Sequence, residues 1–301
     1  MSPLSLRLSI LVAALIVLAS CASPLPPESP PPPDDAAVRR GAYLVAAANC
    51  VGCHTDGAHG GARFAGGRAV ETPFGAYYSR NITPDPEHGI GRWSEAAFLR
   101  ALRQGIAPDG AHYFAAFPFP AFTGMTDRDI LDIFAYLRSQ PSAPAANRPH
   151  DVGFPFDMRL SMVLWRTFYF TEGPLQPDPA QSPEWNRGAY LVTAVSHCGE
   201  CHTPRDALGG PETARRLAGA VLAGPNARKA PNITPQRGDG IGSWSVDDIA
   251  TLLKTGATPI GDTVATPMSE VVEGTAHLTD ADRRAIAVYL KSVPPVPSAA
   301  R

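Results

Sequence analysis

Two short segments of the chain combine cysteine and histidine at the same spacing. They read Cys50-Val51-Gly52-Cys53-His54 and Cys198-Gly199-Glu200-Cys201-His202. In such a segment both cysteines lie on one side of a helical turn, so their sulfur atoms can form thioethers with one porphyrin. The adjacent histidine then lies beneath the iron as an axial ligand. The pattern predicts two haem c groups, with covalent attachment at Cys50, Cys53, Cys198 and Cys201 and iron ligation by His54 and His202.

The same four cysteines allow two other interpretations. They could form two disulfides, or one zinc site built from both Cys-x-x-Cys pairs. A zinc site would have to join pairs that lie about 148 residues apart in the chain. Neither alternative explains why a histidine directly follows each pair, so haem attachment is the favoured interpretation.

Length and composition limit the remaining possibilities. At 301 residues the chain can form two ordinary domains. Its net charge of −2 gives no basic footprint, so nucleic acid is not an expected partner. The 32 prolines and 27 glycines favour short helices joined by irregular loops.

Residues 1–20 read as the signal peptide of a bacterial lipoprotein. Arg7 supplies the positive charge, and residues 8–18 form an apolar run too short to span a bilayer comfortably. The run ends in Leu-Ala-Ser-Cys at Cys21, which resembles a lipobox, whose cysteine becomes the acylated first residue. We therefore expect a lipid anchor at Cys21; a signal peptide cut nearby is the alternative. Residues 21–37 are expected to be a proline-rich, extended tether.

The rest of the chain is one unit written twice. Four motifs recur in the same order at an offset of about 150 residues. They are Arg40–Val45 and Arg187–Val192, Asn81–Pro84 and Asn232–Pro235, Gly89–Ser94 and Gly240–Ser245, and Tyr136–Ser139 and Tyr289–Ser292. This duplication predicts two tandem domains, 38–141 and 183–294, with a connector at 142–182 and a tail at 295–301.

Local signals within each unit predict helices. Each unit has a serine and a threonine typical of helix N-caps, and a glycine typical of helix ends. These residues are Ser94, Thr126 and Gly105 in the first unit and Ser245, Thr279 and Gly256 in the second. Convincing alternating strands are absent, so the predicted fold class is all-α.

The connector has an aromatic and apolar middle, residues 154–170, which is too short for a membrane span. We expect it to pack across the interface between the domains. Its arginines, Arg159 and Arg166, could pair with haem propionates, which need compensation when shielded from water. The alternative is that both arginines are solvated at the surface.

The sixth iron ligand is expected in the loop before the last helix of each unit. In the second unit Met268 lies in this loop and is assigned to the second iron. The aligned residue of the first unit is Phe117, which cannot bind iron. Met125, directly before the Thr126 cap, is the first choice there. The other candidates are His112, Met158, Met162 and an open iron.

The motifs together resemble those of the cytochrome c subunits of membrane-bound bacterial dehydrogenases. The resemblance rests on the doubled Cys-x-x-Cys-His, the Asn-Ile-Thr-Pro followed by Gly-Ile-Gly-x-Trp-Ser, and the terminal Ala-Tyr-Leu, and it covers about residues 38–294. It implies two tandem cytochrome c domains of short helices. Many members carry three haems, whereas this chain has two haem motifs. Several have Met-Pro where this chain has Phe117-Pro118.

The resemblance also implies a function and a location. The chain would carry electrons from a periplasmic or membrane-bound dehydrogenase of alcohols, aldehydes or related substrates to a quinone or oxidase acceptor. It would act at the periplasmic face of a bacterial membrane, and it would not itself be an enzyme. No Gly-x-Ser-x-Gly, His-Glu-x-x-His or P-loop motif occurs. The alternatives are a haem enzyme of peroxidase or thiosulfate-oxidising type with a reactive first haem, and a sensor or structural lipoprotein.

Overall fold

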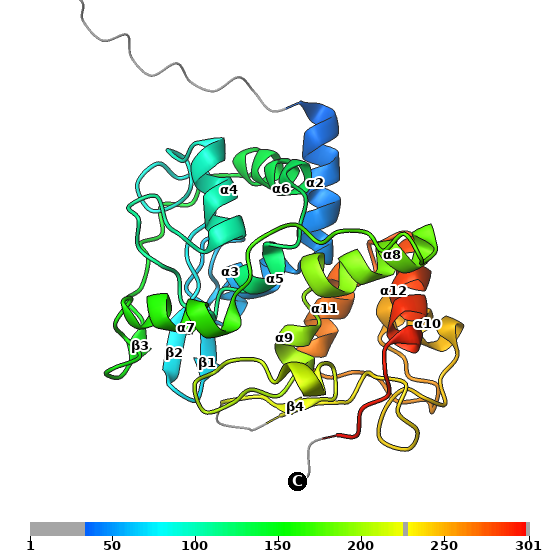
Figure 1. Ribbon diagram of the computed structural model, residues 1–301. Helices are drawn as coiled ribbons and strands as arrows, with labels where there is room; N and C mark the ends of the chain where they lie inside the picture. Colours follow the sequence, from blue (N-terminus) through cyan, green and yellow to red (C-terminus); the bar gives the residue numbers. More distant parts are fainter. Residues whose placement is uncertain (1–33, 225–227, 299–301) are drawn as a thin grey trace, which may run out of the picture. The chain divides into compact units, whose positions relative to one another are not determined.

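The computed structural model describes residues 34–224 and 228–298 (Figure 1). The predicted signal peptide, Cys21 and most of the proline-rich tether lie outside these ranges. All described residues belong to one of the two units into which the chain divides, Pro33–Arg301. Within the described ranges, no helix combines the length and apolar character needed to cross a bilayer.

The first half of the described chain is built mainly from short helices. These are α2 (Asp35–Ala47), α3 (Cys50–His54), the 3-10 turn η1 (Gly57–His59), α4 (Glu95–Gln104), α5 (Phe119–Phe122) and α6 (Asp127–Arg138). The side chain of Asp34 accepts hydrogen bonds from the backbone N–H groups of Ala36 and Ala37 and so caps α2. Residues 35–37, which the sequence places in the tether, are therefore helical.

The second half repeats this series. It contains α8 (Pro183–Tyr190), the π-helical turn η2 (Leu191–Val195), α9 (Gly199–His202), the 3-10 turn η3 (Thr213–Arg215), α10 (Val246–Thr255), α11 (Met268–Thr275) and α12 (Asp280–Ser292). Together α8 and η2 correspond to α2, and α12 corresponds to α6. The tandem repeat of the sequence is therefore also a repeat of helices.

The predicted helix caps are confirmed. Ser94 and Thr126 accept hydrogen bonds from the N–H groups three residues ahead, at 3.2 and 3.1 Å. Ser245 and Thr279 do the same in the second half, at 3.0 and 3.1 Å. The helix-ending glycines Gly105 and Gly256 have φ angles of 63° and 76°, in the left-handed region that favours glycine.

The fold is helix-rich but not purely α-helical. In the first half β1 (Ala69–Thr72), β2 (Gly75–Tyr78) and β3 (Asp151–Val152) form an antiparallel sheet in that order. In the second half β4 (Ala220–Val221) and β5 (Lys229–Ala230) form a two-stranded ladder. With two to four residues each, these strands are too short to show a period of two in the sequence.

The connector packs differently from the prediction. Its strand β3 pairs with β2 of the first half. Its helix α7 (Ser161–Tyr169) buries Met162 among Tyr77, Phe114 and Phe119, all residues of the first half. The end of α7 reaches the second half, where Tyr169 donates a hydrogen bond to Asp206 at 2.8 Å. The connector is therefore chiefly a wall of the first half rather than a layer between the halves.

A glycine allows the first and last helices of each half to cross in close contact. A Cβ atom at Gly41 on α2 would lie 1.9 Å from the carbonyl oxygen of Asp132 on α6. The equivalent atom at Gly188 on α8 would lie 2.0 Å from the carbonyl oxygen of Ala285 on α12. Figure 1 shows both helix pairs side by side. This contact explains why Arg-Gly-Ala-Tyr-Leu-Val occurs in both units.

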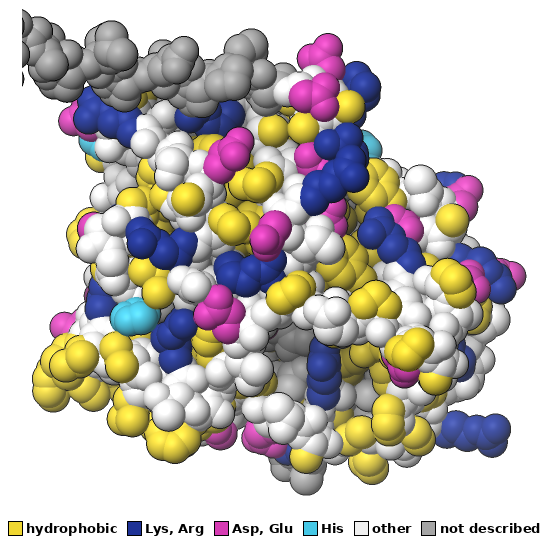
Figure 2. Space-filling view, turned by 45° about the horizontal axis from the view of Figure 1, so that its top comes forward, with side chains coloured by type: hydrophobic (Ala, Val, Ile, Leu, Met, Phe, Trp, Pro, Cys, Tyr) yellow, Lys and Arg dark blue, Asp and Glu magenta, His cyan; other side chains and the backbone are white. Residues whose placement is uncertain are grey.

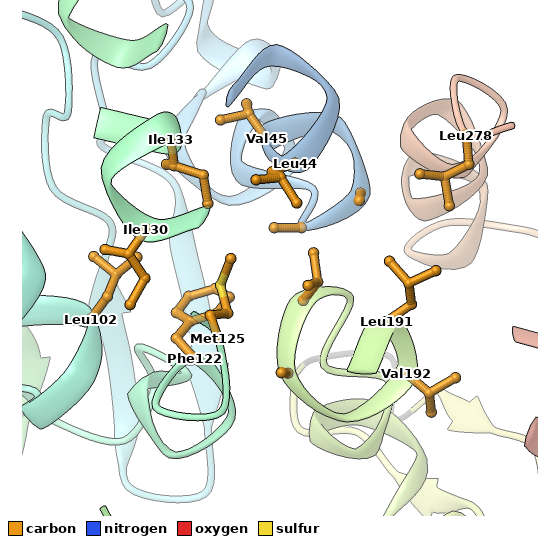
Figure 3. Close-up of a cluster of buried hydrophobic side chains, with 14 of the residues drawn as sticks. Leu44, Val45, Leu102, Phe122, Met125, Ile130, Ile133, Leu191, Val192 and Leu278 are labelled. Carbon is orange, nitrogen blue, oxygen red and sulfur yellow. The ribbon is translucent and has the colours of Figure 1, made fainter. Parts of the chain in front are cut away.

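The two halves share one hydrophobic core. Leu44, Met125 and Ile130 of the first half and Leu191 and Leu278 of the second belong to the same cluster of buried side chains, and Figure 3 shows them pointing toward one another. Each of these side chains is at most 4% exposed. Burying such side chains stabilises the fold by about 1.5–3 kcal/mol each. The halves are therefore held together by an apolar interior and not by polar contacts alone.

A pair of tyrosine contacts joins the halves reciprocally. The Tyr43 hydroxyl of α2 donates a hydrogen bond to Asp282 at 2.6 Å and accepts one from the backbone N–H of Thr279 at 3.1 Å. The same contact recurs with the halves exchanged, between Tyr190, Asp129 and the N–H of Thr126. Each half thus binds the N-terminus of the other half's last helix, and a pseudo-two-fold relation connects the halves.

Charged side chains of both signs are interspersed over the molecular face drawn in Figure 2. On that face they are not gathered into one basic surface. This distribution agrees with the net charge of −2.

Candidate haem-binding sites

Both Cys-x-x-Cys-His segments follow a helix and turn sharply. In the first, Asn49 has a φ of 49° and its side chain accepts a hydrogen bond from the N–H of Gly52 at 3.3 Å. In the second, the equivalent residue His197 has a φ of 38°. The left-handed residue ends the preceding helix and starts the short helical turn that carries the cysteines.

The histidine of each motif is held in one tautomer by a backbone carbonyl. The Nδ1–H of His54 donates to the carbonyl of Arg80 at 2.6 Å, and that of His202 donates to the carbonyl of Pro231 at 2.7 Å. Burial lowers the pKa of both histidines, so the rings are neutral. Each Nε2 then carries a free lone pair, which is the arrangement of an iron-ligating histidine.

The Asn-Ile-Thr-Pro motifs shape the loops that carry these carbonyl groups. The Asn81 side-chain oxygen accepts hydrogen bonds from the N–H and hydroxyl of Thr83 at 2.9 and 2.7 Å. The corresponding bonds between Asn232 and Thr234 are 2.8 and 2.7 Å long. All four residues are buried. The sequence singled out these motifs but gave no role for them; the structure places each directly after the residue whose carbonyl binds the motif histidine.

The cysteines are unbonded and protonated. Neither pair forms a disulfide. Burial raises the pKa of Cys50 and of Cys198 to about 12. In the described ranges, no three His, Cys, Asp or Glu side chains converge as a metal site would require. Neutral thiols beside a histidine with a free Nε2 fit thioether attachment of haem better than a structural zinc site.

A cavity of about 470 Å³ opens beside the first motif. This volume lies in the range of cofactor sites. Cys50, Cys53 and His54 form one wall, and aromatic and aliphatic side chains form most of the remainder. They include Ile82, Trp93, Phe98, Leu102, Tyr113, Phe117, Phe122 and Leu137. The flat aromatic lining and the position of the thiols and the histidine fit a porphyrin.

Two arginines lie on the cavity wall, which also includes the carboxylates of Glu87 and Asp109. Arg80, Arg159 and His150 all line it. Burial lowers the pKa of His150 to about 4, and the charges of the two arginines add to this effect. Among the described residues, neither arginine forms an ion pair with a carboxylate. Cations without an ion-pair partner at this wall fit the propionates of a bound haem. Arg166, the other arginine expected near a propionate, does not line this cavity. Its guanidinium donates to the carbonyl of Gln104 instead.

The two attachment segments are in contact. The Nε2 of His197, directly before Cys198, lies 3.2 Å from the carbonyl oxygen of Ala48, two residues before Cys50. Burial raises the pKa of Cys201 to about 11. The two attachment segments therefore meet at the junction of the halves, although they are far apart in the sequence.

The structure places most of the predicted sixth ligands away from the cavity that His54 lines. Met268 is half-buried and begins α11, directly after Pro267, so it lies in a helix and not in the loop expected from the sequence. Met125 is fully buried in the shared core, and it is not among the residues that line the cavity. His112, Met158 and Met162 are not on this wall either. Phe117 and Tyr113 are.

Comparison with known proteins agrees with this geometry. The family described as Cytochrome c matches residues 38–141 and 186–294. The chain is 43% identical over 260 residues to the fructose dehydrogenase cytochrome subunit of Gluconobacter japonicus. The aligned residues make up 85% of this chain and 52% of that protein. It is 41% identical over 268 residues to a diheme cytochrome c-type protein of Cereibacter sphaeroides. The aligned residues make up 85% of this chain and 86% of that protein.

A third relative is the cytochrome c subunit of the quinone-dependent alcohol dehydrogenase of Gluconobacter oxydans. It is 40% identical over 267 residues, which cover 86% of this chain and 55% of that subunit. The chain thus spans about half the length of the fructose and alcohol dehydrogenase subunits that it matches. The names of these relatives give no support to a peroxidase or thiosulfate-oxidising enzyme. From the two matched segments and the extent of the identity, the chain belongs to the cytochrome c family.

Proposed function

We propose that this protein is a dihaem electron carrier. The observation that carries the proposal is the duplicated axial site, in which each motif histidine donates its Nδ1–H to a carbonyl directly before Asn-Ile-Thr-Pro. A structural repeat that preserves this bond in both halves supports two iron sites rather than one. Bound haem would supply a one-electron couple at each site.

The residues of the chain would have three roles in this function. Thioethers to Cys50 and Cys53, and to Cys198 and Cys201, would fix each porphyrin to its half of the protein. The Nε2 atoms of His54 and His202 would bind the irons from one side. The apolar cavity around the first site would exclude water and so limit the reorganisation that accompanies a change of charge.

We propose a sixth iron ligand, on the side opposite the histidine, for the second site alone. The residue that we propose there is Met268, which begins α11 of the second half and packs against the shared core. Met125 was the first choice for the first iron, but its side chain is buried away from the cavity wall. In the described conformation the residue that faces this cavity at the corresponding place is Phe117.

We also propose a dehydrogenase as the electron donor. Relatives that share about 40% identity with this chain are named as cytochrome subunits of fructose, alcohol and gluconate dehydrogenases. By this comparison the chain would receive electrons from such a subunit and pass them to a quinone or an oxidase. A lipid anchor at Cys21 would hold it at the periplasmic face of the membrane.

The haem content of the mature protein tests the proposal. Intact mass and the pyridine haemochrome spectrum should report two haem c groups per chain. Cys201→Ala should weaken or abolish attachment in the second half, and Cys53→Ala should do so in the first, each leaving the other haem in place. An intact mass without two haem groups, or a spectrum without a c-type band, would contradict the proposal.

The donor is tested separately on native membranes. Fructose, ethanol and gluconate should be added one at a time to membranes that contain the protein, and the reduced haem band should be followed. Reduction by one substrate, abolished when the corresponding dehydrogenase is removed, is the expected result. If no substrate reduces a protein that dithionite reduces fully, the dehydrogenase part of the proposal is wrong and the haem part stands.

A further inference from the structure

His197 belongs to one haem motif by sequence and to the other by position. It directly precedes Cys198, the first cysteine of the second motif. Yet its side chain lines the cavity of the first half, together with Cys50 and His54. The left-handed backbone at this residue, with a φ of 38°, turns the imidazole away from its own motif and towards the other half.

Two contacts fix the His197 ring at the junction. Its Nε2 lies 3.2 Å from the carbonyl oxygen of Ala48, two residues before Cys50. A carbonyl only accepts, so Nε2 carries the proton and donates it. The ring also meets the edge of Phe122 at 5.3 Å between centroids and 82° between planes. Phe122 lines the same cavity, so both neighbours of His197 belong to the surroundings of the first haem.

These contacts make a continuous bonded route between the attachment segments. From Cys198 it runs along one peptide unit to His197, through the ring to Nε2–H, and across one hydrogen bond to the carbonyl of Ala48. From Ala48 it continues through Asn49 to Cys50. The whole route is covalent except for a single hydrogen bond of 3.2 Å. Electron tunnelling is more efficient through bonds and hydrogen bonds than across empty space.

The junction is held rigid on its other side as well. The Arg68 guanidinium donates to the carbonyl of Gly52, between the cysteines of the first motif, at 2.5 Å. It also forms two hydrogen bonds with Glu270 on α11, at 2.7 and 3.1 Å. Further along α11, a Cβ atom on Gly274 would lie 2.2 Å from the carbonyl oxygen of Ala46. The first motif is therefore fixed against the second half, and the hydrogen bond of His197 is not left to a mobile interface.

We infer that His197 is a positioning residue that couples the two haem sites for electron transfer within the chain. The inference rests on the proposed dihaem function. With haem bound at both sites, the supported step would move one electron between the irons, so that one would be oxidised from Fe(II) to Fe(III) and the other reduced from Fe(III) to Fe(II). No bond is formed or broken, and no proton or further reactant is needed. His197 itself keeps its proton on Nε2 throughout.

The test compares His197→Leu, which retains a side chain of similar size without the donor, with His197→Gln, which retains a donor. His59→Leu is the control, because His59 is exposed and, within the described part of the chain, its ring bonds only to Asp56. In the holoprotein one haem is reduced by a flash, and redistribution of the electron is followed at wavelengths that distinguish the haems. Haem content, both midpoint potentials and the rate of reduction by a small donor are measured alongside.

We expect redistribution to be several-fold slower in His197→Leu than in His197→Gln, with two haems attached in both variants and with each rate compared at its own measured pair of midpoint potentials. His197→Gln should restore part of the rate, and His59→Leu should change nothing. A wild-type rate in His197→Leu with both haems present would overturn the inference. So would a loss of haem or a large shift of potential in both variants, because His197 would then serve haem binding itself. A wild-type protein without two haems would instead contradict the proposed function.

Discussion

Replacing Gly41 by alanine should separate the two helices that frame the first half. The added Cβ atom would lie 1.9 Å from the carbonyl oxygen of Asp132 and 2.8 Å from the Cβ of Tyr136. Real contacts of this kind are essentially never closer than 3.0 Å, so α2 and α6 must move apart by at least about 1.1 Å. The obstacle is backbone, which cannot rotate out of the way as a flexible side chain can.

The size of the effect follows from two opposing terms. Forcing an extra carbon into a packed contact costs about 1–3 kcal/mol, and the rigid partner places this case at the upper end. Alanine regains about 1 kcal/mol because it favours a helix more than glycine does. The net loss of unfolding free energy is about 2 kcal/mol, which corresponds to a fall in Tm of about 3–4 °C for a chain of this size.

Denaturant unfolding of the holoprotein, followed by far-ultraviolet circular dichroism, measures this loss. Gly57→Ala is the matched control, because a Cβ there meets nothing within 4 Å, and it should stay within about 0.5 kcal/mol of the wild type. Gly188→Ala repeats the test in the second half, where the distance is 2.0 Å. If Gly41→Ala unfolds at the same denaturant concentration as Gly57→Ala, the close crossing is not a source of stability and the reasoning fails.

Three further predictions concern the junction and the second iron. Although burial opposes it, hydrogen bonds from Arg187 and Tyr43 hold the pKa of Asp282 below its usual value. The stability that this carboxylate contributes is present above its unfolded pKa of about 3.9 and is lost as the pH falls through the folded pKa. Unfolding free energy measured in pH steps should thus decrease below about pH 4. Asp282→Asn should have a lower unfolding free energy at neutral pH, and that free energy should decrease less in acid. Tyr43→Phe and Tyr190→Phe should each lose about 1–2 kcal/mol, and denaturant curves of the double variant should give the sum if the reciprocal contacts are independent. Met268→Leu should remove the methionine–iron charge-transfer band of one haem and leave two haems attached; an unchanged near-infrared spectrum would exclude Met268 as a ligand.

Much of this architecture could be predicted because it depends on residue type. Ser94, Thr126 and Gly105 signal helix boundaries through their own side chains or the lack of one, and all three are found where the sequence places them. The doubled Cys-x-x-Cys-His likewise needs particular side chains at a particular spacing. Such features can be recognised in the sequence without knowledge of the fold.

The hydrogen-bond acceptors of the two motif histidines could not be found in this way. Arg80 and Pro231 have nothing in common except a backbone carbonyl, which every residue possesses. The neighbouring Asn-Ile-Thr-Pro motifs were the available signal, because a buried asparagine that bonds its own backbone usually fixes a loop. The position of the Met125 side chain could not be predicted for another reason. Alignment gives a position along the chain but not the direction in which a side chain points.

The exchanged tyrosine contact means that each half carries both of its members. Tyr43 belongs to the first half, and so do Asp129 and Thr126, which bind the tyrosine of the second half. A surface that offers both partners of one contact is self-complementary, as in an isologous homodimer. The protein is thus laid out as a two-fold dimer whose protomers have become one polypeptide. Covalent joining frees the copies to diverge, and Phe117 opposite Met268 is one such divergence.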